Sequence, residues 1–250
     1  MAGSIGRETA EKVVAIREKW HTKNHPFFLE FAAGKFGLGP VAAMMVQHYQ
    51  HVRRVLPVQG IAYYRAAEGE ARRFILENLA EEEGLMAGPG EGRVAHDHMD
   101  MIFRFCRAAG LSDDEVKRTR QLSTWRARSY FYITTVRDEP FGVVVAMQST
   151  QEGQQPALNG ERMLPAFKKY HGFEIDHPTI EFFAEHYVAD ADHSSRQIDL
   201  VAKLVNDEAT AARALDVAET AVRTRWDCIT EIYRREVLGQ MDPLPAGINA

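Results

Sequence analysis

The stretch from Asp176 to Val205 constrains the fold of this chain most, because it joins helical periodicity to three side chains that bind metals. It reads DHPTIEFFAEHYVADADHSSRQIDLVAKLV, with His186, Asp190 and His193 at its centre. A helix turns by about 100° per residue, which places Asp190 about 40° from His186 and His193 about 20° to the other side. Imidazole and carboxylate groups together suit iron, manganese or zinc. One helix cannot complete the coordination of such a metal, so other helices would have to supply the remaining ligands.

The alternative interpretation of this stretch is a solvated acidic helix. Four further acidic residues support it, namely Glu181, Glu185, Asp192 and Asp199. The choice depends on whether the rest of the chain also places metal-ligand side chains on the inward faces of helices.

The remaining segments also follow helical periodicity, and Gly or Pro residues separate them. The predicted helices cover residues 7–22, 27–33, 40–55, 69–84, 94–109, 112–136, 139–153, 156–170 and 207–236, with a further turn or two at 58–67. The sequence contains no period-2 alternation of any length and no internal repeat, so the pattern predicts an all-α helical bundle. We expect residues 1–250 to form a single domain, with residues 1–6 and 240–250 as loose tails.

Composition excludes several classes of function. The chain has 250 residues and a net charge of −5, and no block of Lys and Arg indicates nucleic-acid binding. No apolar run approaches the ~20 residues of a membrane helix, and the N-terminus lacks the apolar core of a signal peptide. The two cysteines, Cys106 and Cys228, lie far apart and do not indicate a disulfide framework. We therefore expect a cytoplasmic protein that binds neither nucleic acid nor membranes.

The helix predicted at 69–84 aligns Glu82 with its apolar stripe. Glu81 and Glu83 lie about 100° to either side of that stripe, so we expect Glu82 alone to reach the inward point. A carboxylate on an apolar face is costly to bury unless a metal or an arginine pairs with it. Glu82 is therefore the candidate ligand of this helix, and Glu81 and Glu83 are the alternatives.

Two more predicted helices show the same alignment. His98 extends the apolar stripe of its helix, and Glu152 lies in line with the apolar positions of another. A lone histidine on such a stripe is more often a core residue than a ligand, so His98 counts only together with the other candidates. His48 and His51 are open to either role, as outer ligands or substrate contacts, or as core or solvent-facing residues.

The candidate metal ligands are thus three carboxylates and three imidazoles: Glu82, Glu152, Asp190, His98, His186 and His193. A zinc site needs only three or four ligands and would leave the others buried without a partner. Two iron ions in the core of a helical bundle need about this set of ligands. The set therefore predicts a dinuclear site.

At this point the chain resembles the heme-oxygenase-like diiron oxidases and oxygenases of the wider TenA/PqqC-like superfamily. That family shows a Glu, a His after a variable gap, a second Glu far downstream, and then His-x3-Asp/Glu-x2-His. HYVADADH matches the last motif, ENLAEEEG and HMDMIFRFCRAAGL resemble the first Glu and His helices, and QEGQQPALNGERMLPAFKKYHGF resembles the segment of the second Glu. With the early HPFFLEFAAGKF, the resemblance covers most of residues 20–205.

The resemblance implies a non-heme diiron enzyme that activates dioxygen to oxidise a small-molecule substrate. Its implied cofactors are two iron ions with O2 as co-substrate and an external electron donor, and its implied assembly is a homodimer. Similar proteins carry out N-oxygenation or oxidative C–C or C–N cleavage, often in natural-product pathways. The sequence does not identify the substrate or the residues that bind it. Tyr63, Phe131 and Tyr132 are aromatic residues that either line a pocket or pack in the core.

The sequence departs from the family pattern in two places. The loop from Leu85 to Ala95 is expanded, which leaves the first carboxylate ambiguous. The CADD-like branch has a lysine ten residues after the second Glu and uses it in making p-aminobenzoate, whereas Arg162 occupies that place here.

Three other functions are alternatives to a diiron enzyme. The first is a metal-free PqqC-like oxidase. The second is a thiaminase-like hydrolase, for which Cys106 has no evident activating base, and the third is a non-enzymatic helical interaction protein.

Overall fold

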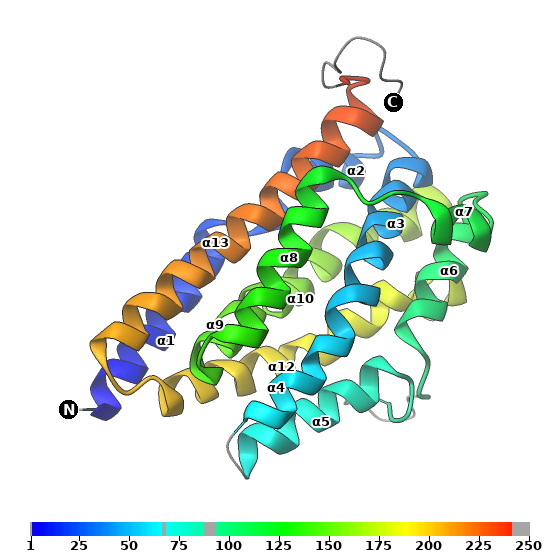
Figure 1. Ribbon diagram of the computed structural model, residues 1–250. Helices are drawn as coiled ribbons and strands as arrows, with labels where there is room; N and C mark the ends of the chain where they lie inside the picture. Colours follow the sequence, from blue (N-terminus) through cyan, green and yellow to red (C-terminus); the bar gives the residue numbers. More distant parts are fainter. Residues whose placement is uncertain (1, 67–68, 88–93, 242–250) are drawn as a thin grey trace, which may run out of the picture.

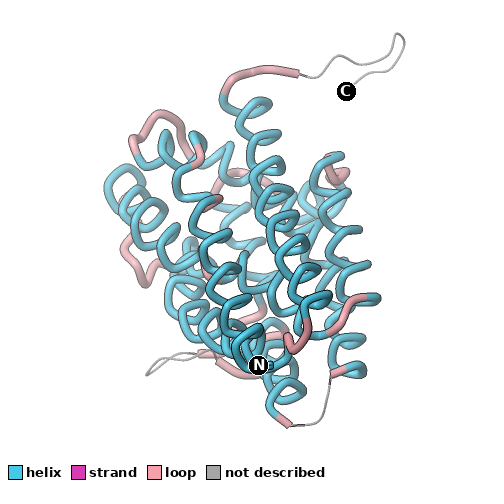
Figure 2. The backbone as a smooth tube through the Cα atoms, turned by 90° about the vertical axis from the view of Figure 1, so that its left-hand side faces the viewer, coloured by secondary structure: helices cyan, strands magenta, loops and turns pink. Residues whose placement is uncertain are grey.

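The computed structural model describes residues 2–66, 69–87 and 94–241, and these residues form helices joined by short loops, with no strand among them (Figures 1 and 2). The α-helices, in chain order, are α1 Ala2–Lys19, α2 Pro26–Ala32, α3 Leu38–Val55, α4 Gln59–Arg65, α5 Glu70–Glu82, α6 His98–Ala108, α7 Asp113–Arg118, α8 Ser123–Asp138, α9 Phe141–Glu152, α10 Gln155–Leu158, α11 Leu164–Ala166, α12 Glu181–Leu204 and α13 Glu208–Ile232. Short 3-10 turns (η1 Thr22–Asn24, η2 Leu56–Val58, η5 Pro178–Ile180) and π-helical turns (η3 Asn159–Met163, η4 Phe167–His171, η6 Tyr233–Val237) connect or extend them. The prediction of an all-α fold is therefore confirmed.

The long helices form a bundle in which α12 runs across the others. In Figure 1, α1, α13, α8 and α3 run roughly alongside one another, and α12 crosses behind them. Helix α12 packs against α9 and α1, and α13 packs against α9, α1 and α8. None of the helices in residues 2–66, 69–87 and 94–241 is long and apolar enough to cross a membrane.

Two apolar cores fill the bundle, and α12 contributes to both. Phe182 and Phe183 belong to the first core, whereas Leu200 and Val201 belong to the second. Between them α12 carries buried polar residues, and α3, α8 and α9 also carry buried polar residues between their contributions to the two cores. These residues are His51, Arg128, Ser129, Gln148, Ser149, Thr150, Asp190, His193, Ser194 and Gln197. A polar layer therefore crosses the bundle between the two cores.

The segment 112–136 is two helices instead of the single helix predicted. Ser112 and Glu115 form the expected capping box, but α7 ends at Arg118 and α8 begins at Ser123. The Gln47 side chain of α3 stabilises the break, because it donates to the backbone oxygen of Arg120 and accepts from the backbone nitrogen of Leu122. A tertiary contact thus satisfies backbone groups that a continuous helix would have paired internally.

The prediction of a loose tail at residues 1–6 is wrong for the described residues 2–6, which start α1. Gly6 explains why this end is held in place. A Cβ atom there would lie 2.1 Å from the backbone oxygen of Ala202 and 2.8 Å from that of Val205. Only glycine permits α1 to approach the end of α12 this closely. At the other end of the chain, residues 242–250 of the tail predicted at 240–250 lie outside the described residues.

Candidate metal centre

Helix α12 places three polar side chains where it passes between the two apolar cores. Asp190 and His193 are buried and His186 is half-buried. Helices α5, α6 and α9 reach the same region. Besides Glu185, seven acidic and histidine side chains of the four helices border two adjoining cavities and form one cluster: Glu81, Glu82, His98, Glu152, His186, Asp190 and His193.

His193 is the centre of one half of this cluster. Its Nε2 lies 2.7 Å from Oε2 of Glu81, and its Nδ1 lies 3.8 Å from Oδ1 of Asp190. One ligand atom from each of Glu152, Asp190 and His193 lies within 4.8 Å of the other two. One imidazole and two carboxylates therefore converge on a small space, with Glu81 at Nε2 of the same imidazole. Oxygen and nitrogen ligands of this kind suit a transition metal such as iron.

The other half of the cluster contains two imidazoles and one carboxylate. Nδ1 of His98 lies 2.7 Å from Oε2 of Glu82, and the ring centroids of His98 and His186 are 4.8 Å apart. Nδ1 of His186 donates a hydrogen bond of 2.7 Å to the backbone oxygen of Phe182. That bond fixes the tautomer of the neutral ring and leaves Nε2 of His186 as the nitrogen that can bind a metal.

The carboxylates of the cluster differ in how far partners within the protein satisfy them. Oδ2 of Asp190 is buried and has no hydrogen-bond partner among the described residues. One oxygen of Glu152, Oε2, accepts a hydrogen bond of 2.7 Å from Nε2 of Gln197, which orients that side chain. A buried carboxylate oxygen without a partner is costly, and a bound cation would remove that cost. The residues present therefore fit a metal ion.

The electrostatics of the cluster also indicate excess negative charge. Burial, together with the charge of Asp190, raises the pKa of Glu152 to about 8. Burial alone would lower the pKa of His193, but its contacts with Asp190 and Glu81 raise it to about 11. Burial alone would raise the pKa of Glu82, but the charge of the neighbouring His98 outweighs burial and lowers it to about 2. Without a metal, protons must compensate the carboxylates, so the cluster favours a cation.

The structure brings the six predicted ligands into this one region, and their binding of metal stays a prediction. The expectation that Glu81 points away from the inward point is wrong, because Glu81 contacts His193. Glu83 is exposed, as expected. Glu81 and Glu82 both lie in the last turn of α5, where Glu81 contacts His193 of α12 and Glu82 contacts His98 of α6. Long glutamate side chains can span the angular difference between neighbouring positions.

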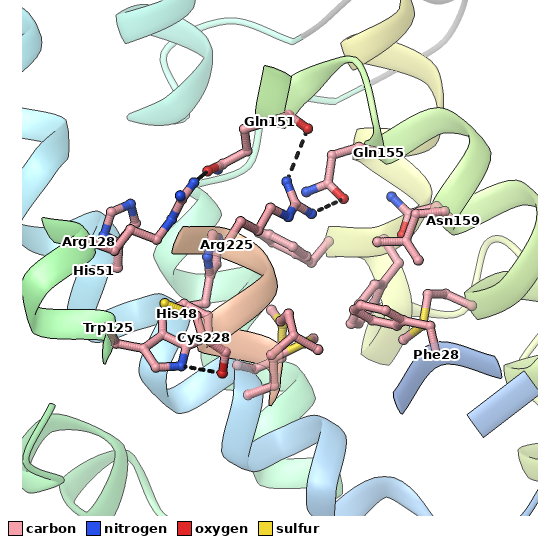
Figure 3. A pocket seen from close by; sticks show the side chains of 17 residues that line it. Phe28, His48, His51, Trp125, Arg128, Gln151, Gln155, Asn159, Arg225 and Cys228 are labelled. Carbon is pink, nitrogen blue, oxygen red and sulfur yellow. Dashed lines mark hydrogen bonds between the residues drawn. The ribbon is translucent and has the colours of Figure 1, made fainter. Parts of the chain in front are cut away.

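A further pocket, the arginine pocket, adjoins the two cavities around the cluster, which are the metal-side cavities. Figure 3 shows the arginine pocket. Two arginines from different helices, Arg128 of α8 and Arg225 of α13, point toward Gln151, which lies next to Glu152 at the end of α9. Five residues border both this pocket and the larger metal-side cavity: His48, His51, Gln151, Gln155 and Phe182. The candidate metal centre and the arginine pocket therefore share a wall.

Sequence reasoning missed both arginines, although a signal was present. Arg128 lies on the stripe that contains Trp125 and Tyr132, and Arg225 lies four residues before the buried Ile229. A basic residue on an apolar stripe is as costly to bury as an acidic one, and it indicates a buried charged site in the same way. His48 and His51, which were open to either role, border the pocket, and burial lowers the pKa of His48 to about 3.

Arg162 and the three candidate aromatic residues differ in where they lie. Arg162, at the place of the family's lysine, donates to the backbone oxygen of Lys23 and does not border either pocket. Of the three aromatic residues, Tyr132 borders the metal-side cavity, Phe131 packs against the second apolar core, and Tyr63 is exposed.

Comparisons with known proteins identify relatives of this chain by sequence. Residues 42–226 match the sequence model of a family described as iron-containing redox enzymes. The chain is 23% identical over 198 residues to 4-aminobenzoate synthase of Chlamydia muridarum, and the matched residues cover 79% of each chain.

Solved structures share the fold at low sequence identity. A protein of Shewanella denitrificans with a heme oxygenase-like fold superimposes with a TM-score of 0.71 at 14% identity, covering 92% of both chains. A TenA homologue of Pseudomonas syringae superimposes with a TM-score of 0.72 at 13% identity, covering 90% of this chain and 93% of that one. These likenesses support the heme-oxygenase-like fold.

Proposed function

We propose, from the premise that this chain belongs to the family of iron-containing redox enzymes, that it is a non-heme diiron oxidase or oxygenase. The proposed enzyme uses O2 to oxidise a small molecule, by N-oxygenation or by oxidative C–C or C–N cleavage. An external donor supplies electrons where the reaction requires them.

One observation carries the proposal of a metal-dependent reaction. Oδ2 of Asp190 is buried without a hydrogen-bond partner among the described residues, within a cluster of four carboxylates and three imidazoles. The cluster divides into a half around His193 and a half around His98. Each half has at least one carboxylate and one imidazole, which supports two metal ions instead of one.

The residues would have distinct roles around the metals. Glu81, Glu152, Asp190 and His193 would hold one iron, and Glu82, His98 and His186 would hold the other. Bound iron would supply the electrons and the open coordination positions that O2 chemistry needs. Gln197 positions Glu152, and the backbone oxygen of Phe182 positions His186. These contacts restrict the ligands before any metal binds.

The relatives named 4-aminobenzoate synthase support an oxidative role but leave the substrate of this chain open. Arg162 occupies the place of the lysine that such proteins are expected to use, and its guanidinium bonds the backbone of Lys23 outside the pockets. We therefore propose that this chain acts on a separate small molecule and not on its own side chain.

A thiol-dependent hydrolysis has weaker support in this fold. Burial raises the pKa of Cys106 to about 12 and that of Cys228 to about 11. A nucleophilic cysteine needs a lowered pKa, so that the thiolate is populated near neutral pH. Both thiols are buried and protonated instead.

Anaerobic titration with Fe(II) tests the proposal directly. We expect close to two irons per chain, measured by metal analysis after desalting, and an absorbance change on exposure to O2. Asp190→Asn removes the charge of the unpartnered carboxylate and should lower iron occupancy. Asp192→Asn on the same helix is the matched control, because its carboxylate is exposed and lies 3.8 Å from Arg196.

Two results would contradict the proposal. Failure of the wild-type chain to bind iron would exclude it, and so would tight binding of zinc with no response of the iron-loaded protein to O2. Equal iron occupancy in Asp190→Asn and Asp192→Asn would show that the buried carboxylate is not a ligand.

A further inference from the structure

The arginine pocket contains two guanidinium groups that are held by neutral partners. Arg128 is 4% exposed and donates to the backbone oxygen of Ala221 at 2.7 Å, to Oγ1 of Thr224 at 3.0 Å and to Oε1 of Gln151. Arg225 donates to the backbone oxygen of Gln151 at 3.1 Å and to Oε1 of Gln155 at 3.3 Å (Figure 3). Within the described part of the chain, no acidic side chain forms an ion pair with either group.

Arg128 is buried and Arg225 is half-buried, and a buried charge without a paired opposite charge is costly. The two arginines also act on each other: burial, with the charge of Arg128, lowers the pKa of Arg225 to about 9. Each guanidinium has five N–H groups, and Arg225 uses two of them in the contacts above. Arg225 therefore retains donors for a further acceptor.

A third donor faces the same pocket. Asn159 is 1% exposed and borders the pocket, and its Nδ2 has no hydrogen-bond partner among the described residues. Figure 3 places Asn159 on the side of the pocket where Gln155 and Arg225 lie. Arg225 has N–H groups left over and Nδ2 of Asn159 has no partner, while Arg128 adds positive charge. The group that would satisfy these donors is an anion with several oxygens.

The remaining wall of the pocket is apolar. Phenylalanine, methionine, tryptophan and aliphatic side chains form it: Phe28, Met44, Met45, Trp125, Leu158, Met163, Phe182, Phe183 and Ile229. Small-molecule sites commonly combine such a wall with a few convergent polar groups. The occupant should therefore have one charged end and an apolar body.

The position of Gln151 links this pocket to the candidate metal centre. Gln151 accepts from both arginines, and the next residue, Glu152, borders the metal-side cavity. Both cavities share Gln151, Gln155 and Phe182 in their walls. A molecule held by the arginines would therefore extend toward the carboxylates and histidines.

We propose that this pocket binds the carboxylate of the substrate, so that the enzyme acts on an organic acid with an apolar body. Arg225 and Asn159 bind the carboxylate, Arg128 positions Gln151 and adds positive charge, and the opposite end of the substrate faces the metal centre. The assignment of the bound acid as the substrate rests on the proposed function, whereas the anion pocket itself does not.

Calorimetric titration of the metal-free, full-length chain tests the pocket with a matched pair of probes. 4-Phenylbutyrate carries a carboxylate on an apolar body, and 4-phenylbutanamide is its neutral counterpart. We expect the carboxylate to bind at least about tenfold more tightly than the amide. Arg225→Gln should remove this preference, and Arg225→Lys, which keeps the charge, should retain much of it.

Arg223→Gln is the matched control, because Arg223 is exposed on the same helix and pairs with Glu219 at the surface. Its preference for the carboxylate should equal that of the wild-type chain. Circular dichroism establishes that each variant is folded. Equal binding of the two probes by the wild-type chain would overturn the proposal, and so would an unchanged preference in folded Arg225→Gln.

The outcomes separate the pocket from the proposed function. A preference for the carboxylate that depends on Arg225, in a chain that binds no iron, would support the anion pocket and contradict the diiron enzyme. Two irons per chain with no preference for the carboxylate would support the diiron enzyme and overturn the anion pocket.

Discussion

Oε2 of Glu81 lies 2.7 Å from Nε2 of His193, although the neighbouring Glu82 is the residue aligned with the apolar stripe of α5. Glu82 instead contacts His98 of α6. Adjacent carboxylates at the end of one helix thus approach two different histidines on two other helices. This arrangement assigns one glutamate of α5 to each half of the candidate metal centre.

Replacing either glutamate by its amide should therefore reduce iron binding. We expect Glu81→Gln and Glu82→Gln each to lose about one of the two irons, because an amide lacks the charge that holds a cation. Metal analysis after anaerobic loading measures the occupancy. Glu83→Gln is the control, since Glu83 is exposed and should keep both irons. Full occupancy in Glu81→Gln would show that the contact with His193 has no role in metal binding.

The close packing of α1 on α12 predicts an effect on stability. Gly6→Ala places a Cβ atom against the backbone oxygens of Ala202 and Val205, which cannot rotate away. We expect a loss of about 1–3 kcal/mol in the free energy of unfolding, measured by urea denaturation.

Gly60→Ala is the matched control for this substitution. Gly60 lies in α4, and a Cβ atom there would meet nothing within 4 Å. Alanine favours the helix, so this variant should be unchanged or more stable by up to about 1 kcal/mol. Equal stability of Gly6→Ala and the wild-type chain would mean that α1 does not pack this closely.

The buried His25 predicts a loss of stability in acid. Its Nδ1 accepts a hydrogen bond from the backbone nitrogen of Phe27, and its Nε2 lies 3.0 Å from Oγ1 of Thr230. Burial lowers the pKa of His25 from 6.5 to about 4 in the folded state. The unfolded chain therefore binds a proton between these pH values that the folded chain does not, and stability falls as the pH drops from 6.5 toward 4.

His25→Asn should reduce this pH dependence. Asparagine can still accept from the backbone nitrogen of Phe27, but it does not titrate. Its free energy of unfolding should fall less steeply between pH 6.5 and pH 4. The slope should differ from that of the wild-type chain by at most about 1.4 kcal/mol per pH unit. Urea denaturation of the metal-free protein at several pH values measures the slope. An identical slope in both proteins would show that His25 titrates normally in the folded state.

Two glutamines of α3 should stabilise the connection between α7 and α8. Nε2 of Gln50 donates to the backbone oxygen of Val116 at 2.8 Å, and Gln47 bonds the backbone on both sides of Gln121. Replacing either glutamine by methionine keeps the volume but leaves buried backbone groups unpaired. We expect each variant to lose about 1–3 kcal/mol of unfolding free energy, measured by urea denaturation. Unchanged stability would indicate that water replaces these bonds.

The sequence by itself determined the helical class and grouped the candidate ligands by helix face. Helical periodicity is a local property, and residues four and seven apart on one helix share a face whatever surrounds it. His186, Asp190 and His193 could therefore be grouped before any tertiary contact was known. The same reasoning aligned Glu82, His98 and Glu152 with the inward faces of their helices.

Only the tertiary structure decided how these faces meet. The reach of Glu81 to His193 depends on where α12 passes the end of α5, which no periodicity describes. The break between α7 and α8 depends on Gln47 of another helix. Arg128 and Arg225 are 97 residues apart, and they come together only because α8 packs against α13. Contacts between helices follow from the packing of the whole bundle, so the sequence of one segment cannot specify them.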